Sequence, residues 1–219
     1  MSAQRQERRG YDSTGRRAQA QATRAKILDV ARRLFIEQGF AGTSMAQVAA
    51  AAGVSAPTVF AAFKSKVNLL KVAAETMIVG DAEPVPLAER PEMRHVHAGA
   101  TAEEVLDRLA TLNAATAERA YPIFAVLYAA ADAEPEIAEL VRLIDTQRLA
   151  GATMLARTVV ERIGDNTPAR LAEVRDTIWA FNSLAMYGLL VVQRGWSVER
   201  YRDWLRRALH SVVDPDASG

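Results

Sequence analysis

The stretch from Ser44 to Lys66 limits the possible folds more than any other part of the chain, because it contains the start and stop signals of two short helices. Ser44 and Gln47 have the spacing of a capping box, which predicts that a helix begins directly after Ser44. Gly53 predicts the end of that helix, since glycine adopts the left-handed backbone of a helix terminus without a Cβ penalty. Ser55 then caps a second helix that has a proline in its first turn. Two short helices joined by so tight a turn indicate a helix-turn-helix.

The residues before this stretch predict a third helix that braces it. Apolar side chains repeat at helical spacing from Thr23 to Gln38, and Gly39 follows directly. Beyond Lys66 the apolar pattern stays helical, and no segment shows the alternation of a β-strand. The sequence therefore predicts an all-α protein of about nine helices, with a three-helix domain before a larger helical domain. The expected parts are a flexible basic arm (1–22), the helix-turn-helix domain (23–66), the larger domain (67–213) and a tail (214–219).

Caps and prolines divide the larger domain into segments. Residues 81–100 contain three prolines, which predicts a loop or a partly helical segment. The pair Tyr121-Pro122 is expected to separate two helices. The expected helices run from 66 to about 79, from 101 to about 119, onward from 123, from 135 to about 163, from 168 to 194, and from 198 to 212.

The net charge of +1 conceals a division between the two ends of the chain. Residues 1–71 carry 12 Lys and Arg against 4 Asp and Glu, whereas residues 72–219 carry 15 against 22. A basic first third suits a polyanionic partner, and the acidic remainder should face away from it. Arginines of the arm, Arg16 and Arg17 among them, can add counterion-release affinity and enter a narrow minor groove. The alternative is a solubilising tail.

Several other classes of protein are not indicated. The chain has no cysteine, which excludes a disulfide framework and a cysteine-based zinc site and fits a cytoplasmic location. The first 26 residues lack the apolar core of a signal peptide, and the longest apolar run, Trp179 to Val192, is too short to span a membrane. His95 and His97 lack a clear third metal ligand. We expect no metal, no cofactor and no membrane partner.

The order of short motifs from Arg24 to about Val72 resembles the amino-terminal DNA-binding domain of the TetR family of bacterial transcriptional regulators. The shared elements are Gly-Phe, Thr-Ser, Ala-Gly-Val-Ser, Thr-Val-aromatic and Phe-x-Ser-Lys, all in register. The resemblance implies that Ala56 to Phe63 form the helix that reads DNA. The residues that match the usual DNA contacts are Thr43, Ser44, Ala56, Pro57, Thr58, Phe60, Lys64 and Lys66.

Two departures from the family pattern affect how DNA would be read. Phe60 stands where family members usually carry tyrosine, so the hydroxyl that would bond a phosphate is absent. Val67 replaces a usual glutamate, and Ala61 and Ala62 replace longer polar groups. Base-edge hydrogen bonds are therefore scarce. We expect readout through apolar contacts such as that of Thr58 with thymine methyls, through groove shape and through the arginine arm.

The segment from Pro168 to Arg194 is apolar on more than one face, which a single core contact does not require. The resemblance implies that the last two helices form a four-helix bundle between two copies, so the expected homodimer interface is residues 168–194 and 198–212. A two-fold dimer would present two reading helices to a palindromic site about one DNA turn apart. The alternative is a helix buried within one chain.

An effector site in the remaining helices would combine aromatic rings with a few polar groups. Such a lining suits a small, mostly apolar molecule, although each residue could equally serve the core or the interface. The candidates are Tyr121, Phe124, Tyr128, Gln147, Met154, Trp179 and Asn182.

The pattern as a whole indicates a DNA-binding regulator, most simply a repressor that an effector releases from its operator. Two alternatives stay open: an architectural DNA binder without an effector, and a helical enzyme or carrier. An enzyme is not expected, because the chain has no G-x-S-x-G, phosphate-binding glycine loop or H-E-x-x-H motif, and its three histidines are not arranged around a nucleophile.

Overall fold

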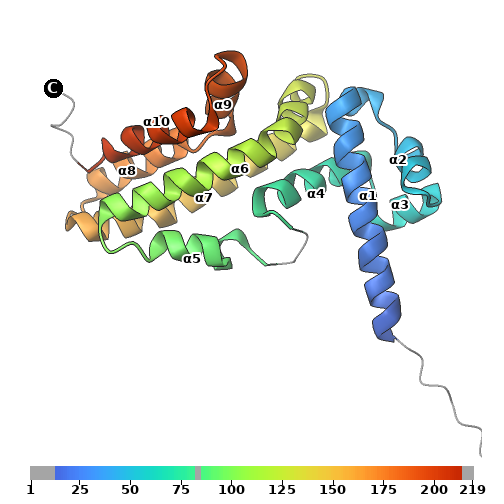
Figure 1. The fold of residues 1–219 in the computed structure, drawn as a ribbon, viewed down its shortest axis with the longest axis horizontal. Helices are drawn as coiled ribbons and strands as arrows, with labels where there is room; N and C mark the ends of the chain where they lie inside the picture. The colour runs from blue at the N-terminus through green and yellow to red at the C-terminus, as the bar shows by residue number, and fades with distance from the viewer. Residues whose placement is uncertain (1–12, 82–84, 214–219) are drawn as a thin grey trace, which may run out of the picture.

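The computed structural model describes residues 13–81 and 85–213, and within these ranges the chain is all-α with no strand (Figure 1). The prediction of an all-α fold is confirmed. Two shorter segments, η1 (Leu87–Glu89) and η2 (Gly188–Gln193), are 3-10 and π-helical. The α-helices are α1 (Ser13–Gly42), α2 (Met45–Ala52), α3 (Ala56–Phe63), α4 (Lys66–Val79), α5 (Pro91–His97), α6 (Ala102–Ala131), α7 (Pro135–Ile163), α8 (Pro168–Phe181), α9 (Leu184–Tyr187) and α10 (Val198–His210).

The first three helices lie together at one end of the molecule, and α4 leads from them to the larger helical part (Figure 1). In that part the long helices α6 and α7 pack against each other, α8 packs on α7, and α10 packs on α6. Helix α6 also packs against α1 and α4, so the hydrophobic core continues from the first three helices into the larger part.

The first helix begins earlier than its apolar pattern predicts. It starts at Ser13, ten residues before the expected start at Thr23, so residues 13–22 of the predicted flexible arm are helical. Residues 1–12 of that arm lie outside the described residues. The end of the apolar pattern is placed correctly, because Gly39 has a positive φ of 72° that interrupts the helix there.

Two predicted boundaries in the larger part are wrong. Tyr121-Pro122 does not separate two helices: α6 continues through Pro122. A proline inside a helix costs about 3 kcal/mol, and packing against six other helices outweighs this cost. Conversely, the helix expected from Pro168 to Arg194 is broken at Asn182 and Ser183, which cap α8 and α9. Short polar side chains favour caps because they hydrogen-bond the backbone.

The segment after α4 is partly helical, as predicted. Its described residues contain η1 and α5, which begins at Pro91. Arg90 is buried and binds Asp81 through two hydrogen bonds of 2.6 and 2.9 Å. This ion pair joins the chain just after α4 to the residue that precedes α5.

Candidate nucleic-acid interface and effector site

The caps between α2 and α3 are those that the sequence predicts. The Ser44 Oγ accepts from the amide of Gln47 at 3.2 Å, and the Gln47 Oε1 accepts from the amide of Ser44 at 2.8 Å. Gly53 adopts a φ of 67°, and Ser55 caps α3. The two helices are bent by 112° relative to each other, which is the geometry of a helix-turn-helix.

The two faces of α3 differ sharply in exposure. Val59 and Phe63 are fully buried against the other helices. Pro57, Thr58 and Phe60 are exposed, and 49% of Phe60 is accessible. The exposed face therefore consists of apolar groups and one hydroxyl, as the sequence predicts. That hydroxyl lies 2.8 Å from the Oγ of Ser55, so it takes part in the cap of its own helix.

Two of the residues matched to family DNA contacts have structural surroundings instead. Thr43 is 1% exposed, and its hydroxyl lies within hydrogen-bond distance of the carbonyls of Leu34 and Gly39. The Nζ of Lys66 donates to the carbonyl of Phe40 at 2.9 Å and lies 4.0 Å from the centre of its ring. Neither placement fits the expected contact with DNA.

Lys64, in contrast, is exposed at the end of α3. Its φ of 66° is unusual for a residue other than glycine, and its amide closes the helix by donating to the carbonyl of Phe60 at 2.8 Å. This left-handed turn ends α3 abruptly and places a cation directly beside its exposed face. Of the two lysines predicted to bind phosphate, the structure thus supports Lys64.

One contact that fixes α3 cannot be found from helical spacing. The Nη1 of Arg24 donates to the carbonyl of Ala62 at 2.8 Å, and its guanidinium lies 4.2 Å from the centre of the Phe63 ring. Arg24 belongs to α1, 38 positions away from Ala62. The sequence carries no local signal for this contact, because the two residues meet only in the folded domain.

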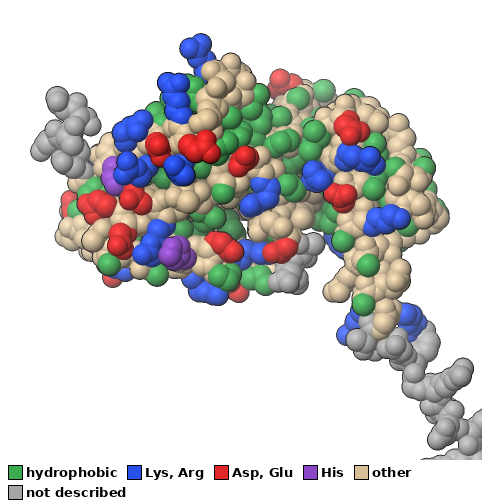
Figure 2. All heavy atoms as spheres, in the orientation of Figure 1, with side chains coloured by type: hydrophobic (Ala, Val, Ile, Leu, Met, Phe, Trp, Pro, Cys, Tyr) green, Lys and Arg blue, Asp and Glu red, His purple; other side chains and the backbone are tan. Residues whose placement is uncertain are grey.

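The start of α1 extends beyond the packed helices (Figure 1). Arg16 and Arg17 lie on this extension with exposed side chains, and lysine and arginine side chains are visible on the extension as well as over the rest of the face shown (Figure 2). The described residues from 15 to 22 are all exposed. These two predicted contacts therefore occupy a helical extension whose side chains are open to solvent.

The predicted effector residues lie on three helices of the larger part. Phe124 is buried with its ring centre 6.1 Å from that of Tyr128, and Tyr121 packs against Tyr187 at 5.5 Å. Burial raises the pKa of Tyr128, and the nearby Arg148 opposes this rise. Of the remaining candidates, Gln147, Met154 and Trp179 are exposed, and Asn182 is half-buried.

Arg148, which the sequence did not single out, connects these groups. Its guanidinium lies 5.6 Å from the centre of the Trp179 ring, and its Nη2 donates to the carbonyl of that residue at 2.7 Å. Its Nη1 donates to Asp145 at 2.7 Å. The Nε of Arg148 is buried and has no hydrogen-bond partner among residues 13–81 and 85–213. A buried donor without a partner is costly, so this nitrogen marks a place where an acceptor would be stabilised.

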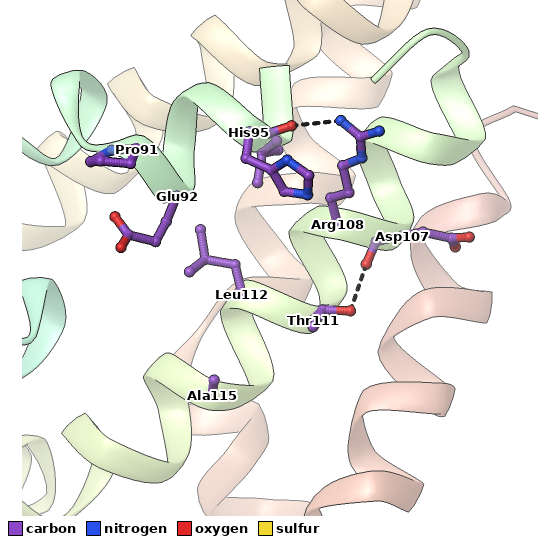
Figure 3. A pocket seen from close by; sticks show the side chains of 9 residues that line it. Pro91, Glu92, His95, Asp107, Arg108, Thr111, Leu112 and Ala115 are labelled. Atoms are coloured by element: carbon purple, nitrogen blue, oxygen red, sulfur yellow. Dashed lines mark hydrogen bonds between the residues drawn. The ribbon is translucent and has the colours of Figure 1, made fainter. Parts of the chain in front are cut away.

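A separate hollow of about 660 Å³ lies between α5 and α6 (Figure 3). None of the seven predicted effector residues lines it. The Nη1 of Arg108 donates to the carbonyl of His95 at 2.8 Å across its edge. Its lining residues are Pro91, Glu92, His95, Val96, Asp107, Arg108, Thr111, Leu112 and Ala115.

His97 and His210 make separate contacts on different helices. The Nδ1 of His97 lies 2.8 Å from the hydroxyl of Thr158, and burial lowers its pKa. His210 pairs with Asp107 at 2.7 Å between α10 and α6. Within residues 13–81 and 85–213, no three His, Cys, Asp or Glu side chains are grouped as metal ligands. No single helix in this described part is long and apolar enough to cross a membrane; only the bent pair α2 and α3 passes by length and composition.

Matches to known families and sequences lie in the first third of the chain. Residues 27–73 match the family model described as bacterial regulatory proteins, tetR family. A segment of 51 residues is 49% identical to the HTH-type transcriptional regulator AcrR of Shigella flexneri. The match covers 23% of this chain and 24% of that protein, so the chain spans only a quarter of the curated relative.

Similar solved structures extend over most of the chain. A TetR-family regulator from Rhodococcus sp. has a TM-score of 0.63 at 16% identity, over 89% of this chain and 100% of its own. A regulator from Saccharomonospora viridis in complex with choline has a TM-score of 0.59 at 21% identity, over 85% of this chain and 95% of its own. MexZ, a repressor from Pseudomonas aeruginosa, has a TM-score of 0.58 at 23% identity, over 90% of this chain and 98% of its own. At these identities the similarity shows a common fold.

Proposed function

Because the chain belongs to the TetR family of bacterial transcriptional regulators, we propose that it is a homodimeric repressor of a palindromic operator, released when a small, mostly apolar effector binds. The observation that carries this proposal is the exposed outer face of α3. That face belongs to a short helix held by the Ser55 cap, by the turn at Lys64 and by Arg24 of α1. A rigid helix with one free face is suited to the major groove.

The proposed DNA contacts divide into two kinds. Lys64, Arg16 and Arg17 bind phosphates and supply salt-dependent affinity. Ser44 at the start of α2 lies where free helix amides also favour phosphate. Base pairs are contacted by the apolar outer groups of α3, which suit thymine methyls better than hydrogen-bonding edges. The residues of this second kind are Ala56, Pro57, Thr58 and Phe60.

The proposed dimer interface is residues 168–194 and 198–212. Support for the first range comes from large apolar side chains that remain open to solvent, namely Trp179, Leu189 and Val192, of which Val192 is 57% exposed. Exposed groups of this size favour a protein partner. The second range offers less support for an interface, because Leu205 and Leu209 are already buried within this chain.

The proposed effector site contains the seven candidates together with Arg148. Its aromatic rings provide an apolar lining, and the Nε of Arg148 provides a donor for a carbonyl or ether oxygen. The hollow between α5 and α6 is a second candidate, because the exposed Glu92 carboxylate beside Leu112 suits a cation with an apolar body. Choline, which a structural relative binds, is a suitable first probe for the second site.

The test begins with DNA fragments from upstream of the gene. We expect the purified protein to retard its own promoter fragment in a gel shift assay and to lose affinity as salt increases. Absence of salt-sensitive binding to every upstream fragment would contradict the proposal. Native mass spectrometry of the same sample measures the dimer mass and identifies any co-purified effector.

A further inference from the structure

The last turn of α4 exposes carbonyl groups that its own helix cannot satisfy, because a helix end leaves four acceptors without intrahelical partners. Gly80 ends the helix with a φ of 94°, and its amide satisfies the carbonyl of Thr76 at 2.8 Å. The next two carbonyls, those of Met77 and Ile78, need donors from elsewhere.

Arg119 of α6 supplies both donors. Its Nε donates to the carbonyl of Met77 at 2.7 Å, and its Nη2 donates to that of Ile78 at 2.9 Å. The guanidinium lies beside Gly80, where a Cβ would be in ordinary contact with its central carbon at 3.8 Å. A cation at this position also opposes the negative end of the helix dipole. One side chain therefore joins two helices, and it lies 42 positions from Met77 and 41 from Ile78 in the sequence.

The other end of α4 is fixed to the helix that reads DNA. The Nδ2 of Asn68, in the first turn of α4, donates to the carbonyl of Phe63 at 2.8 Å. Ser65 caps α4 immediately after α3 has ended at Phe63. With one end joined to α3 and the other held by Arg119, α4 connects α3 to the larger part, alongside the packing of α1 on α6.

The segment of α6 that carries Arg119 also faces the interior of the larger part. Tyr121, two residues on, packs against Tyr187 and fits beside Gly188, where a Cβ would lie 2.5 Å from its ring. Pro122 has no amide hydrogen to donate to the carbonyl of Glu118, so the backbone hydrogen bonding of α6 is interrupted in this turn. A change in the packing around Tyr121 can thus reach Arg119 within one helical turn.

We infer that Arg119 is a positioning residue: by capping α4 from α6, it fixes the orientation of the reading domain and couples the interior of the larger part to DNA binding. The coupling to DNA rests on the proposed function. The mechanical part of the inference does not, because it concerns only the arrangement of helices in the free protein.

The first experiment tests the mechanical part without DNA. The chain has no cysteine, so spin labels can be placed at Ala51→Cys on α2 and Arg157→Cys on α7, both exposed. Dilution with unlabelled protein isolates the distance within one chain. We expect Arg119→Met to broaden or shift the distance distribution, and Arg119→Lys to restore it in part. Arg142→Met, which removes an exposed arginine paired within α7, is the control. An unchanged distribution in Arg119→Met would overturn the inference.

The second experiment measures affinity for the promoter fragment, with the binding-competent fraction fixed by stoichiometric titration. We expect Arg119→Met to weaken binding roughly fivefold or more, since coupling between sites is commonly of that size. Its salt dependence should equal that of the wild type, because no phosphate contact is lost. A shallower salt dependence would identify a direct DNA contact and overturn the positioning role, as would an unchanged affinity. Failure of the wild type to bind any fragment would refute the proposed function and leave the label result to decide the mechanical part.

Discussion

Lys64 and Lys66 lie two positions apart but have different surroundings. Lys64 is exposed beside the outer face of α3, whereas the ammonium of Lys66 is held by the carbonyl and ring of Phe40. The same residue type therefore has two different roles. Lys64 is available to a phosphate, whereas Lys66 joins the start of α4 to the end of α1.

The two lysines should respond differently to substitution by alanine. Lys64→Ala should lower DNA affinity for all sequences and reduce the salt slope by about 1, because one phosphate contact is lost. Lys66→Ala should leave that slope unchanged and lower the free energy of unfolding by about 1 kcal/mol. Fluorescence anisotropy at several salt concentrations and chemical denaturation measure the two effects. Equal salt slopes for both variants would contradict this assignment.

Tyr201 is a second residue whose surroundings decide its chemistry. It is 1% exposed, its ring lies 5.3 Å from that of Tyr187, and burial raises its pKa to about 12. The neutral phenol is favoured in the folded protein, so the pKa is lower in the unfolded chain, at about 10.

Alkaline unfolding tests this pKa shift. Below about pH 10 Tyr201 is neutral in both states, and its contribution to stability is complete. Between about pH 10 and 12 the unfolded chain alone loses the proton, so the free energy of unfolding falls by roughly 2 to 3 kcal/mol. Tyr201→Phe should remove this part of the decrease. Identical pH profiles for wild type and Tyr201→Phe would show that the shift is absent.

At the scale of elements, the break in the segment from Pro168 to Arg194 follows from both local and distant contacts. Asn182 and Ser183 supply the caps that end α8 and start α9. The π-helical segment η2 begins at Gly188, which lies against the ring of Tyr121 from α6. Segments of this kind often occur at functional sites. Only a residue without a side chain fits at this crossing of the two helices.

Gly188→Ala should therefore destabilise the protein. The added Cβ would lie 2.5 Å from the Tyr121 ring, and overpacking of a core typically costs about 1 to 3 kcal/mol. Thermal or urea denaturation measures the loss. The double variant with Tyr121→Ala should lose less stability than the two single variants lose together, because the clash is then absent. Strict additivity would show that Tyr121 is not the obstacle.

At the scale of the whole molecule, the chain has two surfaces of different character, which the proposed function assigns to DNA and to a second copy of the chain. The reading end carries Lys64 and the arginines of α1, and the far part carries exposed apolar groups on α8 and η2. Spacing between two reading helices would then be set by contacts far from the DNA. This division is the basis of the proposed selectivity, because α3 itself offers few hydrogen bonds to bases.

Val192→Glu tests the apolar surface. The side chain is 57% exposed, so the change should not affect folding of one chain, yet a buried carboxylate would oppose an interface there. Native mass spectrometry at micromolar concentration should show a shift from dimer to monomer, with unchanged circular dichroism. Arg157→Glu, on α7 outside the proposed interface, also adds negative charge at an exposed position without removing an apolar group, and serves as the control. A fully dimeric Val192→Glu protein would place the interface elsewhere.

The sequence by itself determined what depends on neighbours in the chain. The capping box of Ser44, the positive φ of Gly53 and the exposed outer face of α3 follow from hydrogen bonds and periodicity within a few residues. The all-α class follows in the same way. These features are local, so they were predicted with the correct boundaries.

Only the tertiary structure decided which side chains contact distant segments. It turned Thr43 and Lys66 inward, kept α6 continuous through Pro122, and brought Arg119 to the end of α4. Each outcome depends on a carbonyl or a helix that lies far away in sequence, or on packing that outweighs a local preference. Charge and periodicity do not encode such partners, because an arginine that caps a helix and one that binds a phosphate are the same residue in the sequence.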